Sequence, residues 1–172
     1  MNNFDICLVR ASLSDAEKIW SMQKEAFTKL FEKYQDFETS PATEPLERTV
    51  LKLKQSETYF YMIQFDGQTV GAVRVVDSGN NSLKRISPMF ILSEFRNIGI
   101  AQKAIKTIEE IHGSKNWELA TIMQEKGNCH LYEKMGYRTT GETKPFKSFS
   151  PSNGWRELSL LTTTIGNVST TS

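Results

Sequence analysis

Residues 83–123 constrain the fold more than any other part of the chain. A strand pattern over residues 83–92 is followed by a helical pattern over 99–112 and a second strand pattern over 117–123. Strands joined through a helix run parallel in one sheet, so this unit predicts a parallel crossover with the helix packed on the sheet. Pro88 lies inside the first strand and cannot donate a ladder hydrogen bond, so we expect a bulge or an edge there.

Antiparallel strands are expected on both sides of this unit. The segment YFYMIQF, residues 59–65, runs into an Asp66-Gly67 turn and then into residues 70–76, which is a strong hairpin signal. Three further strands are expected near the ends of the chain, over residues 6–10, 137–142 and 155–163.

The remaining helices follow from capping and periodicity. Ser14 with Glu17 has the spacing of a reciprocal cap, and apolar residues then recur at helical period over 19–34. A shorter helix is expected after Pro45, and another with Asn128 as its N-cap.

Together these patterns predict one mixed α/β domain, with a central mixed sheet of about seven strands and about four helices on both faces. The chain has 172 residues, which suffices for one core. We expect a single domain over residues 1–163 and a polar C-terminal tail over 164–172.

Charge and composition narrow the choice of partners. The chain has 21 Lys and Arg against 20 Asp and Glu, and a formal charge of +1 gives no global field for nucleic acid or an anionic membrane. A basic leader and a long apolar run are both missing, so we expect a cytoplasmic protein. The two cysteines, Cys7 and Cys129, and the two histidines, His112 and His130, lack the spacing of a disulfide framework or a metal site.

The turn between the strand at 83–92 and the helix at 99–112 has the composition of an anion-binding loop. The first amides of a helix have no partner inside it, and the helix dipole adds positive charge there. Gly99 does not block a pyrophosphate, Arg96 supplies charge, and Ala101 is small. On composition alone a simple tight turn is the commoner explanation, and the missing P-loop and three-glycine patterns argue against nucleoside triphosphates and NAD.

Two motifs resemble those of the GCN5-related N-acetyltransferases, the GNAT family. Residues 96–101, RNIGIA, resemble that family's Arg/Gln-x-x-Gly-x-Gly/Ala pyrophosphate loop, and residues 131–137, LYEKMGY, resemble its downstream tyrosine motif. The resemblance implies a GNAT-like acyl-CoA N-acyltransferase fold with acetyl-CoA as co-substrate. The family often has an asparagine seven residues before the tyrosine, where this chain has Glu125, and Asn128 is the nearer asparagine.

The resemblance also implies roles for individual residues. In the family, the pantetheine arm pairs with the bulged strand and the acetyl group sits where two parallel strands splay apart. The implied cofactor-binding residues are Phe90, Ile91, Leu92, Arg96, Asn97, Ile98, Gly99, Ile100, Ala101, Gln102 and Asn128. The amide of Leu92 or a neighbour would polarise the thioester carbonyl, and Tyr132 would donate a proton to the departing sulfur. Without the family, Tyr132 is better explained as a core aromatic residue with its hydroxyl at the surface.

The acceptor site is expected around the first two helices and their connection. Glu25, Tyr34 and Asp36 are the candidate substrate residues, with either carboxylate, or a water chain to it, as the base, although such residues are mostly solvated surface. An acidic wall of Asp36, Glu38 and Glu44 would favour a cationic amine such as a polyamine or a peptide amino group.

Three functions from different classes fit the sequence. The favoured one is an acetyl-CoA-dependent N-acetyltransferase that acts on a primary amine of a small molecule or peptide by direct attack. A degenerate acyl-CoA-binding or regulatory domain is the second, and an interaction module in which Gly99 is only a turn is the third. The expected loop at 143–153 could form a homodimer contact or fold over the substrate.

Overall fold

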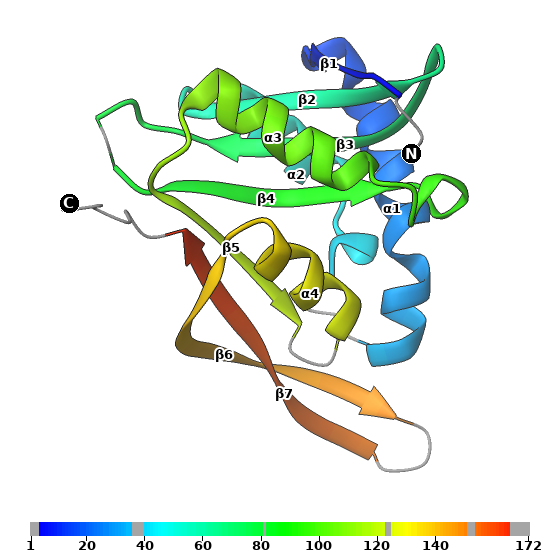
Figure 1. Cartoon of the computed structure of the whole chain (residues 1–172). Helices are drawn as coiled ribbons and strands as arrows, with labels where there is room; N and C mark the ends of the chain where they lie inside the picture. The colour runs from blue at the N-terminus through cyan, green and yellow to red at the C-terminus, as the bar shows by residue number, and fades with distance from the viewer. Residues whose placement is uncertain (1–3, 36–39, 81, 123–124, 151–153, 166–172) are drawn as a thin grey trace, which may run out of the picture.

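The computed structural model describes residues 4–35, 40–80, 82–122, 125–150 and 154–165, with the backbone path alone for 120–122, 139–150 and 154–165. Seven strands form one sheet in the order β1-β2-β3-β4-β5-β7-β6, which confirms the predicted mixed α/β architecture (Figure 1). The strands are β1 (Ile6–Arg10), β2 (Thr58–Phe65), β3 (Gln68–Val76), β4 (Lys84–Ile91), β5 (Trp117–Ile122), β6 (Arg138–Ser150) and β7 (Gly154–Ile165). The helices are α1 (Ala16–Tyr34), α2 (Leu46–Lys54), α3 (Ile100–His112) and α4 (Lys126–Lys134).

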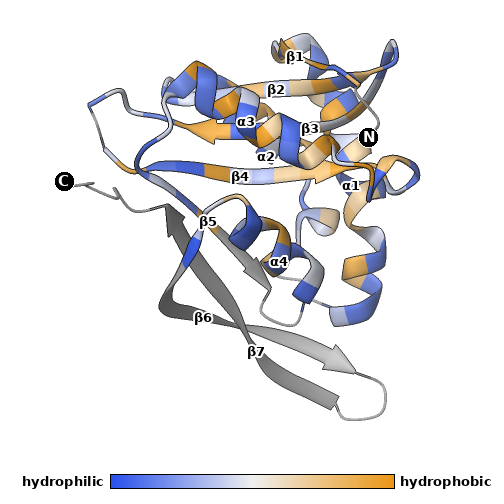
Figure 2. Ribbon diagram, viewed as in Figure 1, coloured by the Kyte–Doolittle hydropathy of each residue, from blue (hydrophilic) through white to orange (hydrophobic). Residues whose placement is uncertain are grey.

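The sheet is covered on both faces because its central strands are apolar on both sides (Figure 2). Tyr61 and Ile63 of β2 pack in one cluster with α3, whereas Phe60 and Met62 pack in the other with α1. Successive side chains of a strand point to opposite faces, so this alternation places α3 and α1 on opposite sides of the sheet. Figure 1 shows α4 on the same side as α3.

The predicted hairpin and the predicted crossover are both confirmed. Asp66 and Gly67 have φ of 50° and 74°, the left-handed values of a tight two-residue hairpin turn. Strands β4 and β5 pair in parallel, with α3 between them in the chain. In β3, Gly71 lies so close to β4 that an added Cβ would collide with the carbonyl oxygen of Phe90.

The irregularity expected at Pro88 is also present. Val73 pairs with Met89, but Val75 pairs with Ile86, so β4 has one more residue than β3 between these two pairs. The extra residue falls at the cis Ser87–Pro88 peptide. This is a β-bulge, and it changes which groups of β4 face the neighbouring strands.

Three sequence predictions need correction. Helix α1 is preceded by a short 3₁₀ turn, and the reciprocal cap is formed by Ser12 with Asp15 instead of Ser14 with Glu17. The Ser12 amide donates to the Asp15 carboxylate at 2.9 Å. The sequence contains two overlapping Ser-x-x-acid patterns, and the earlier one, Ser12 with Asp15, forms the cap. Asn128 is not an N-cap, since α4 begins at Lys126 with Glu125 in the capping position.

The third correction concerns the C-terminal part of the chain. Residues 143–150, expected in a loop, belong to β6, which pairs antiparallel with β7 as far as Ser150 and Gly154. Strand β7 also extends two residues into the stretch expected to be a tail. Residues 151–153 and 166–172 lie outside the described part of the chain.

Candidate active site

The connection into α3 leaves backbone amides available for an anion. Asn97 and Gly99 have φ of 64° and 94°, so the chain turns through left-handed conformations just before the helix. The first amide used by the helix is that of Lys103, which donates to the Gly99 carbonyl at 3.2 Å. Within the described residues, the amides of Gly99, Ile100, Ala101 and Gln102 donate to no protein acceptor. Four such donors at a helix start are a ready anion site.

Arg96 does not present its charge at this loop as the sequence suggested. Its Nε donates to the carbonyl of Ile91 at 2.8 Å and one Nη donates to the carbonyl of Ala26 at 2.6 Å. The guanidinium therefore ties α1 to the end of β4. Any contribution of Arg96 to cofactor binding stays a prediction that depends on its position in the loop.

Strands β4 and β5 are joined over only a short stretch. Their parallel pairing comprises Lys84 with Trp117 and Arg85 with Glu118, although β4 continues to Ile91 and β5 to Ile122. Beyond the second pair the strands diverge, and in Figure 1 their ribbons separate toward the arrowheads. After Arg85, the peptide groups on the β5 side of β4 are therefore not paired with β5.

The alternation of the ladder identifies which amide faces that edge. The Leu92 amide donates to the Val70 carbonyl at 2.8 Å. This N–H therefore faces β3 and is not available to polarise the carbonyl of a bound thioester. Bonded and non-bonded positions alternate in an antiparallel pair, which directs the N–H and C=O of Ile91 to the opposite side. The Ile91 carbonyl indeed accepts from Arg96. Of the residues at the end of β4, it is therefore Ile91 whose amide N–H faces the open edge and can donate to a bound carbonyl.

Tyr132 lies on α4, half-buried against the cluster formed around α3. Its ring meets that of Tyr137 edge-on, with centroids 6.0 Å apart and an interplanar angle of 64°. Burial, with a smaller contribution from Cys129, raises the pKa of Tyr132 to about 12. The hydroxyl is therefore protonated at neutral pH, as a proton donor requires.

Sequence reasoning missed a cluster at the start of α4. Glu125 accepts hydrogen bonds through Oε1 from Lys33 Nζ at 2.7 Å and from the Tyr34 hydroxyl at 2.6 Å. Burial opposes ionisation of Glu125, but the two hydrogen bonds outweigh it and lower its pKa. Tyr34, one of the predicted substrate residues, is only 6% exposed and is held here. The sequence feature that could have pointed to this cluster is Glu125 itself, which stands where the family often has an asparagine.

The other predicted acceptor residues are not gathered in one place. Glu25 is exposed on α1, Asn128 is exposed in the first turn of α4, and Asp36 and Glu38 lie outside the described residues. Glu44, the described member of the expected acidic wall, is bonded to Lys52 at 2.6 Å and to Gln23 at 2.7 Å. The proposed acidic wall therefore has one described member, and its charge is already paired.

Cofactor-strand residues divide between the two faces of the sheet. Phe90 packs with α1, its ring edge-on to Phe27 at 5.9 Å, whereas Ile91 packs with α3.

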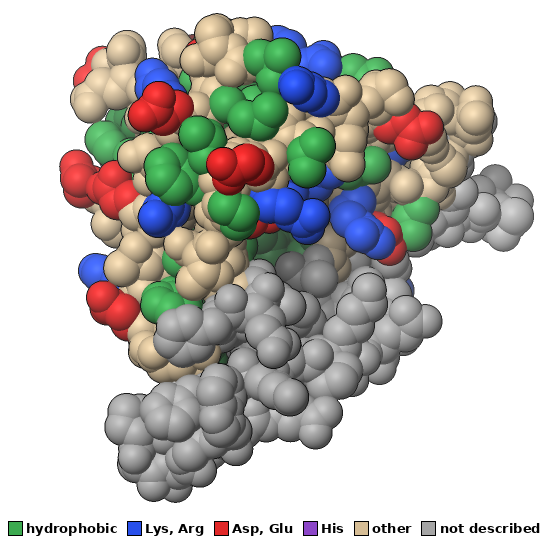
Figure 3. Space-filling view, turned by 180° about the vertical axis from the view of Figure 1, so that it is seen from behind, with side chains coloured by type: hydrophobic (Ala, Val, Ile, Leu, Met, Phe, Trp, Pro, Cys, Tyr) green, Lys and Arg blue, Asp and Glu red, His purple; other side chains and the backbone are tan. Residues whose placement is uncertain are grey.

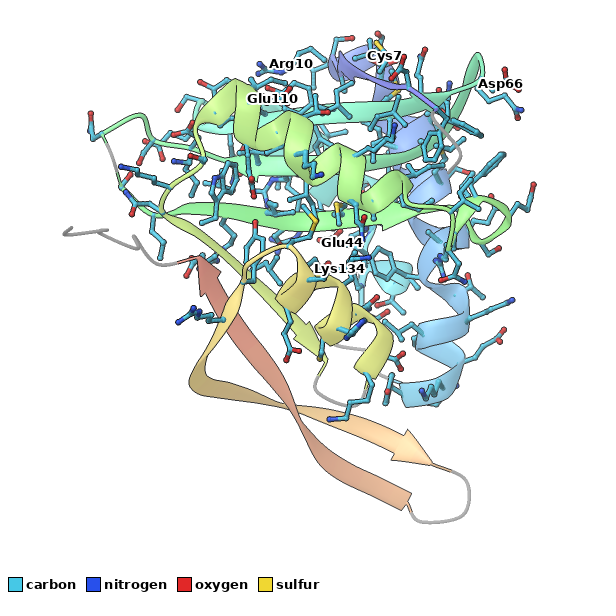
Figure 4. All side chains as sticks on the ribbon, in the orientation of Figure 1. Cys7, Arg10, Glu44, Asp66, Glu110 and Lys134 are labelled. Carbon is cyan, nitrogen blue, oxygen red and sulfur yellow. The ribbon has the colours of Figure 1, made fainter. Side chains whose placement is uncertain are left out.

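Cys7 lies on the edge strand β1 (Figure 4), and no disulfide joins it to Cys129. On the face seen in Figure 3, basic and acidic side chains are interspersed, in keeping with the charge of +1.

None of the described helices is both long and apolar enough to cross a bilayer. In the same part of the chain, no group of three or more His, Cys, Asp or Glu side chains is placed to hold a metal ion.

A bulged strand beside a diverging parallel partner, followed by a helix with open amides, makes this a GNAT-like acyl-CoA N-acyltransferase fold. The family model described as an acetyltransferase (GNAT) domain matches residues 20–150. The chain therefore belongs to the GNAT acetyltransferase family, and it is an acyltransferase.

Relatives agree with this assignment. The chain is similar to an N-alpha-acetyltransferase of Sulfurisphaera tokodaii, with 23% identity over 112 residues that cover 57% of this chain and 67% of the relative. Its fold is similar to that of spermidine N-acetyltransferase from Vibrio cholerae in complex with CoA and spermine, with a TM-score of 0.70, 16% identity, and 93% and 94% of the two chains covered. It is also similar to that of the microcin C7 self-immunity acetyltransferase MccE in complex with acetyl-CoA and AMP, with a TM-score of 0.64, 18% identity, and coverage of 95% and 92%.

Proposed function

We propose that this chain is an acetyl-CoA-dependent N-acetyltransferase that acetylates a primary amine of a small molecule or peptide by direct attack. The observation that carries the proposal is the set of open amides at Gly99–Gln102, next to the end of a strand that diverges from its parallel neighbour. Family membership and neighbours in complex with CoA or acetyl-CoA support the same co-substrate.

The residues present fit acetyl-CoA at its pyrophosphate and along its pantetheine arm. The amides of Gly99, Ile100, Ala101 and Gln102 would hold the pyrophosphate, with Asn97 and Ile98 shaping the turn before them. An added Cβ at Gly99 would meet only the Phe4 ring at 3.7 Å, so the protein itself does not fill this position closely. The edge of β4 at Phe90–Leu92 would run beside the pantetheine arm. The co-substrate, when bound, supplies the acyl group as a thioester.

Two donors of the chain would act on the reacting groups. The Ile91 amide, which faces away from β3, would donate to the carbonyl oxygen and stabilise negative charge on it. The Tyr132 hydroxyl, with a pKa of about 12, is a weaker acid than an exposed tyrosine. It would therefore act as a hydrogen-bond donor that stabilises negative charge on the departing sulfur, since full transfer of its proton to a thiolate with an ordinary pKa of about 8.5 is unfavourable.

Thermal denaturation with and without acetyl-CoA tests binding. A ligand at about 100 times its Kd stabilises the native state by about 2.7 kcal/mol. For a domain of this size that corresponds to a rise in Tm of about 5–10 °C. An unchanged Tm at saturating acetyl-CoA would contradict the proposal.

Thiol release from acetyl-CoA over a panel of amines tests turnover. Tyr132→Phe should lower kcat by about 10²-fold, since it removes the proton donor, and should keep the rise in Tm with acetyl-CoA. If kcat is unchanged in Tyr132→Phe, the role assigned to Tyr132 is wrong. If acetyl-CoA raises Tm but no amine releases thiol, the degenerate acyl-CoA-binding domain is the correct function.

Three expectations from the sequence accompany this proposal and stay predictions. They are the single domain over residues 1–163, apart from the two residues by which β7 extends beyond it, the cytoplasmic location, and a role of the segment 143–153 in either a homodimer contact or closure over the substrate. Size-exclusion chromatography with light scattering measures whether the chain forms a homodimer.

A further inference from the structure

Lys33, Tyr34 and Glu125 form a cluster, here termed the ammonium cluster, between the end of α1 and the start of α4. Lys33 Nζ lies 2.7 Å from Glu125 Oε1 and 5.2 Å from the centroid of the Tyr34 ring. A carboxylate combined with an aromatic ring is the chemistry that recognises an ammonium group. The cluster already holds one, which belongs to the protein itself.

The ammonium of Lys33 is weakly held. The Lys33 side chain is 58% exposed, whereas that of Glu125 is 24% exposed. An exposed lysine in an ion pair contributes little to stability, because the pair is solvated and the long side chain loses freedom. Both hydrogen bonds to Glu125 end on Oε1, which leaves Oε2 outside this pair of bonds. A second cation can therefore approach the carboxylate and displace Lys33.

The cluster lies at the end of β5 that diverges from β4. Glu125 follows the C-terminal end of β5, the strand that diverges from β4, and it caps the helix that carries Tyr132. Figure 1 shows the end of α1 beside the start of α4 near the arrowhead of β5. Seven residues separate Glu125 from Tyr132. At the helical rise this is about 10 Å along the axis.

We propose that the ammonium cluster binds a second, protonated amine of the acceptor in place of Lys33, so that the preferred substrates are linear diamines and longer polyamines. This inference rests on the proposed function. An ammonium group has no lone pair, so the nitrogen held by Glu125 cannot attack the thioester. The reacting nitrogen must be a different one, several methylene groups away and close to Tyr132.

Matched acceptors test this directly. For the wild-type enzyme, kcat/KM for a linear α,ω-diamine should exceed that for the monoamine of the same chain length by about 10-fold, the size expected of a partly buried charge-assisted contact. In Glu125→Gln the two acceptors should become nearly equal. In Lys33→Met, KM for the diamine should fall about 3-fold, since the competing cation is gone, with no change for the monoamine.

Lys29→Met is the matched control, because Lys29 is exposed on the same helix one turn earlier. It should leave KM for both acceptors as in the wild type. A gain in Lys33→Met cannot arise from loss of folding, so this variant keeps the test valid even if Glu125→Gln is less stable. Equal kcat/KM for diamine and monoamine in the wild type, or an unchanged KM in Lys33→Met, would overturn the inference.

Failure of the proposed function can be separated from failure of the inference. If no amine is acetylated, calorimetric titration of the diamine into the wild type and into Glu125→Gln still measures how tightly the ammonium cluster binds the diamine. About 10-fold weaker binding to Glu125→Gln would support the inference, and equal binding would refute it.

Discussion

Gly99→Ala tests whether the loop before α3 binds its ligand through the backbone. Gly99 has φ of 94°, a left-handed value that alanine adopts at a cost of about 1–2 kcal/mol. An added Cβ would meet only Phe4 Cζ at 3.7 Å, which is an ordinary contact, so no steric clash adds to this cost. The expected fall in Tm without ligand is about 2–8 °C.

The same substitution should weaken acetyl-CoA binding. The methyl group would stand next to the amides of Gly99 and Ile100, which donate to no protein acceptor among the described residues and where we propose that the pyrophosphate binds. Loss of one charge-assisted hydrogen bond is worth about 1.5 kcal/mol, or about tenfold in Kd. At a concentration of about 100 times the wild-type Kd, stabilisation by acetyl-CoA should therefore fall from about 2.7 to about 1.4 kcal/mol.

Gly67→Ala is the matched control for this measurement. Gly67 has φ of 74° and no atom within 4 Å of the position of an added Cβ, so its backbone cost is similar, but it lies in the β2–β3 turn. Thermal denaturation of both variants, with and without acetyl-CoA, separates the two effects. If Gly99→Ala keeps the full stabilisation by acetyl-CoA, or if Gly67→Ala loses it equally, the assignment of the loop is wrong.

Three further predictions concern stability. Gly71→Ala should lower the free energy of unfolding by about 3 kcal/mol or more in a urea titration, because the new methyl group collides with the backbone of β4. His112→Asn should cost about 2 kcal/mol in the same assay, since the His112 ring bonds Asp77 at 2.8 Å and Tyr61 at 2.8 Å. Burial opposes ionisation of Asp77 and Glu44, but their hydrogen bonds outweigh it and lower both pKa values. Their stabilisation is therefore present above the ordinary carboxyl pKa of about 4 and is lost as pH falls below it, so Glu44→Gln should flatten the acid limb of Tm against pH.

Features governed by a few neighbouring residues could be predicted from the sequence. The Asp66-Gly67 turn, the bulge at Pro88 and the glycine at the start of α3 each depend on local backbone preferences. Each of them was located at the correct residues. Residues 143–150 are rich in Lys, Pro, Phe and Ser, which favours a loop, whereas pairing with β7 supplies backbone hydrogen bonds, with no donor at Pro145, and does not require a strand period in the side chains.

Contacts between distant parts of the chain could not be predicted in this way. Arg96 reaches a carbonyl 70 residues away, and Glu125 bonds Tyr34 at a separation of 91 residues. These partners are set by how α1 crosses the end of the sheet, which no local pattern encodes. From its position in the motif alone, Arg96 is therefore predicted to bind the pyrophosphate. In the same way, Glu125 is seen only as the position where the family's asparagine is absent.

Basic side chains next to the α3 loop are held by the protein, which determines how the loop can bind an anion. Arg96 donates to Ile91 and Ala26, and Lys103 donates to the Phe4 carbonyl. Binding there would depend on the open amides and the helix dipole, so it should be sensitive to backbone changes and tolerant of changes in the neighbouring side chains. A charged carboxylate stands instead at the start of α4, where Glu125 holds an ammonium group. On the proposals made above, backbone donors would bind the part of the co-substrate that is the same for every acyl-CoA, and a charged side chain would bind the acceptor, which differs between enzymes.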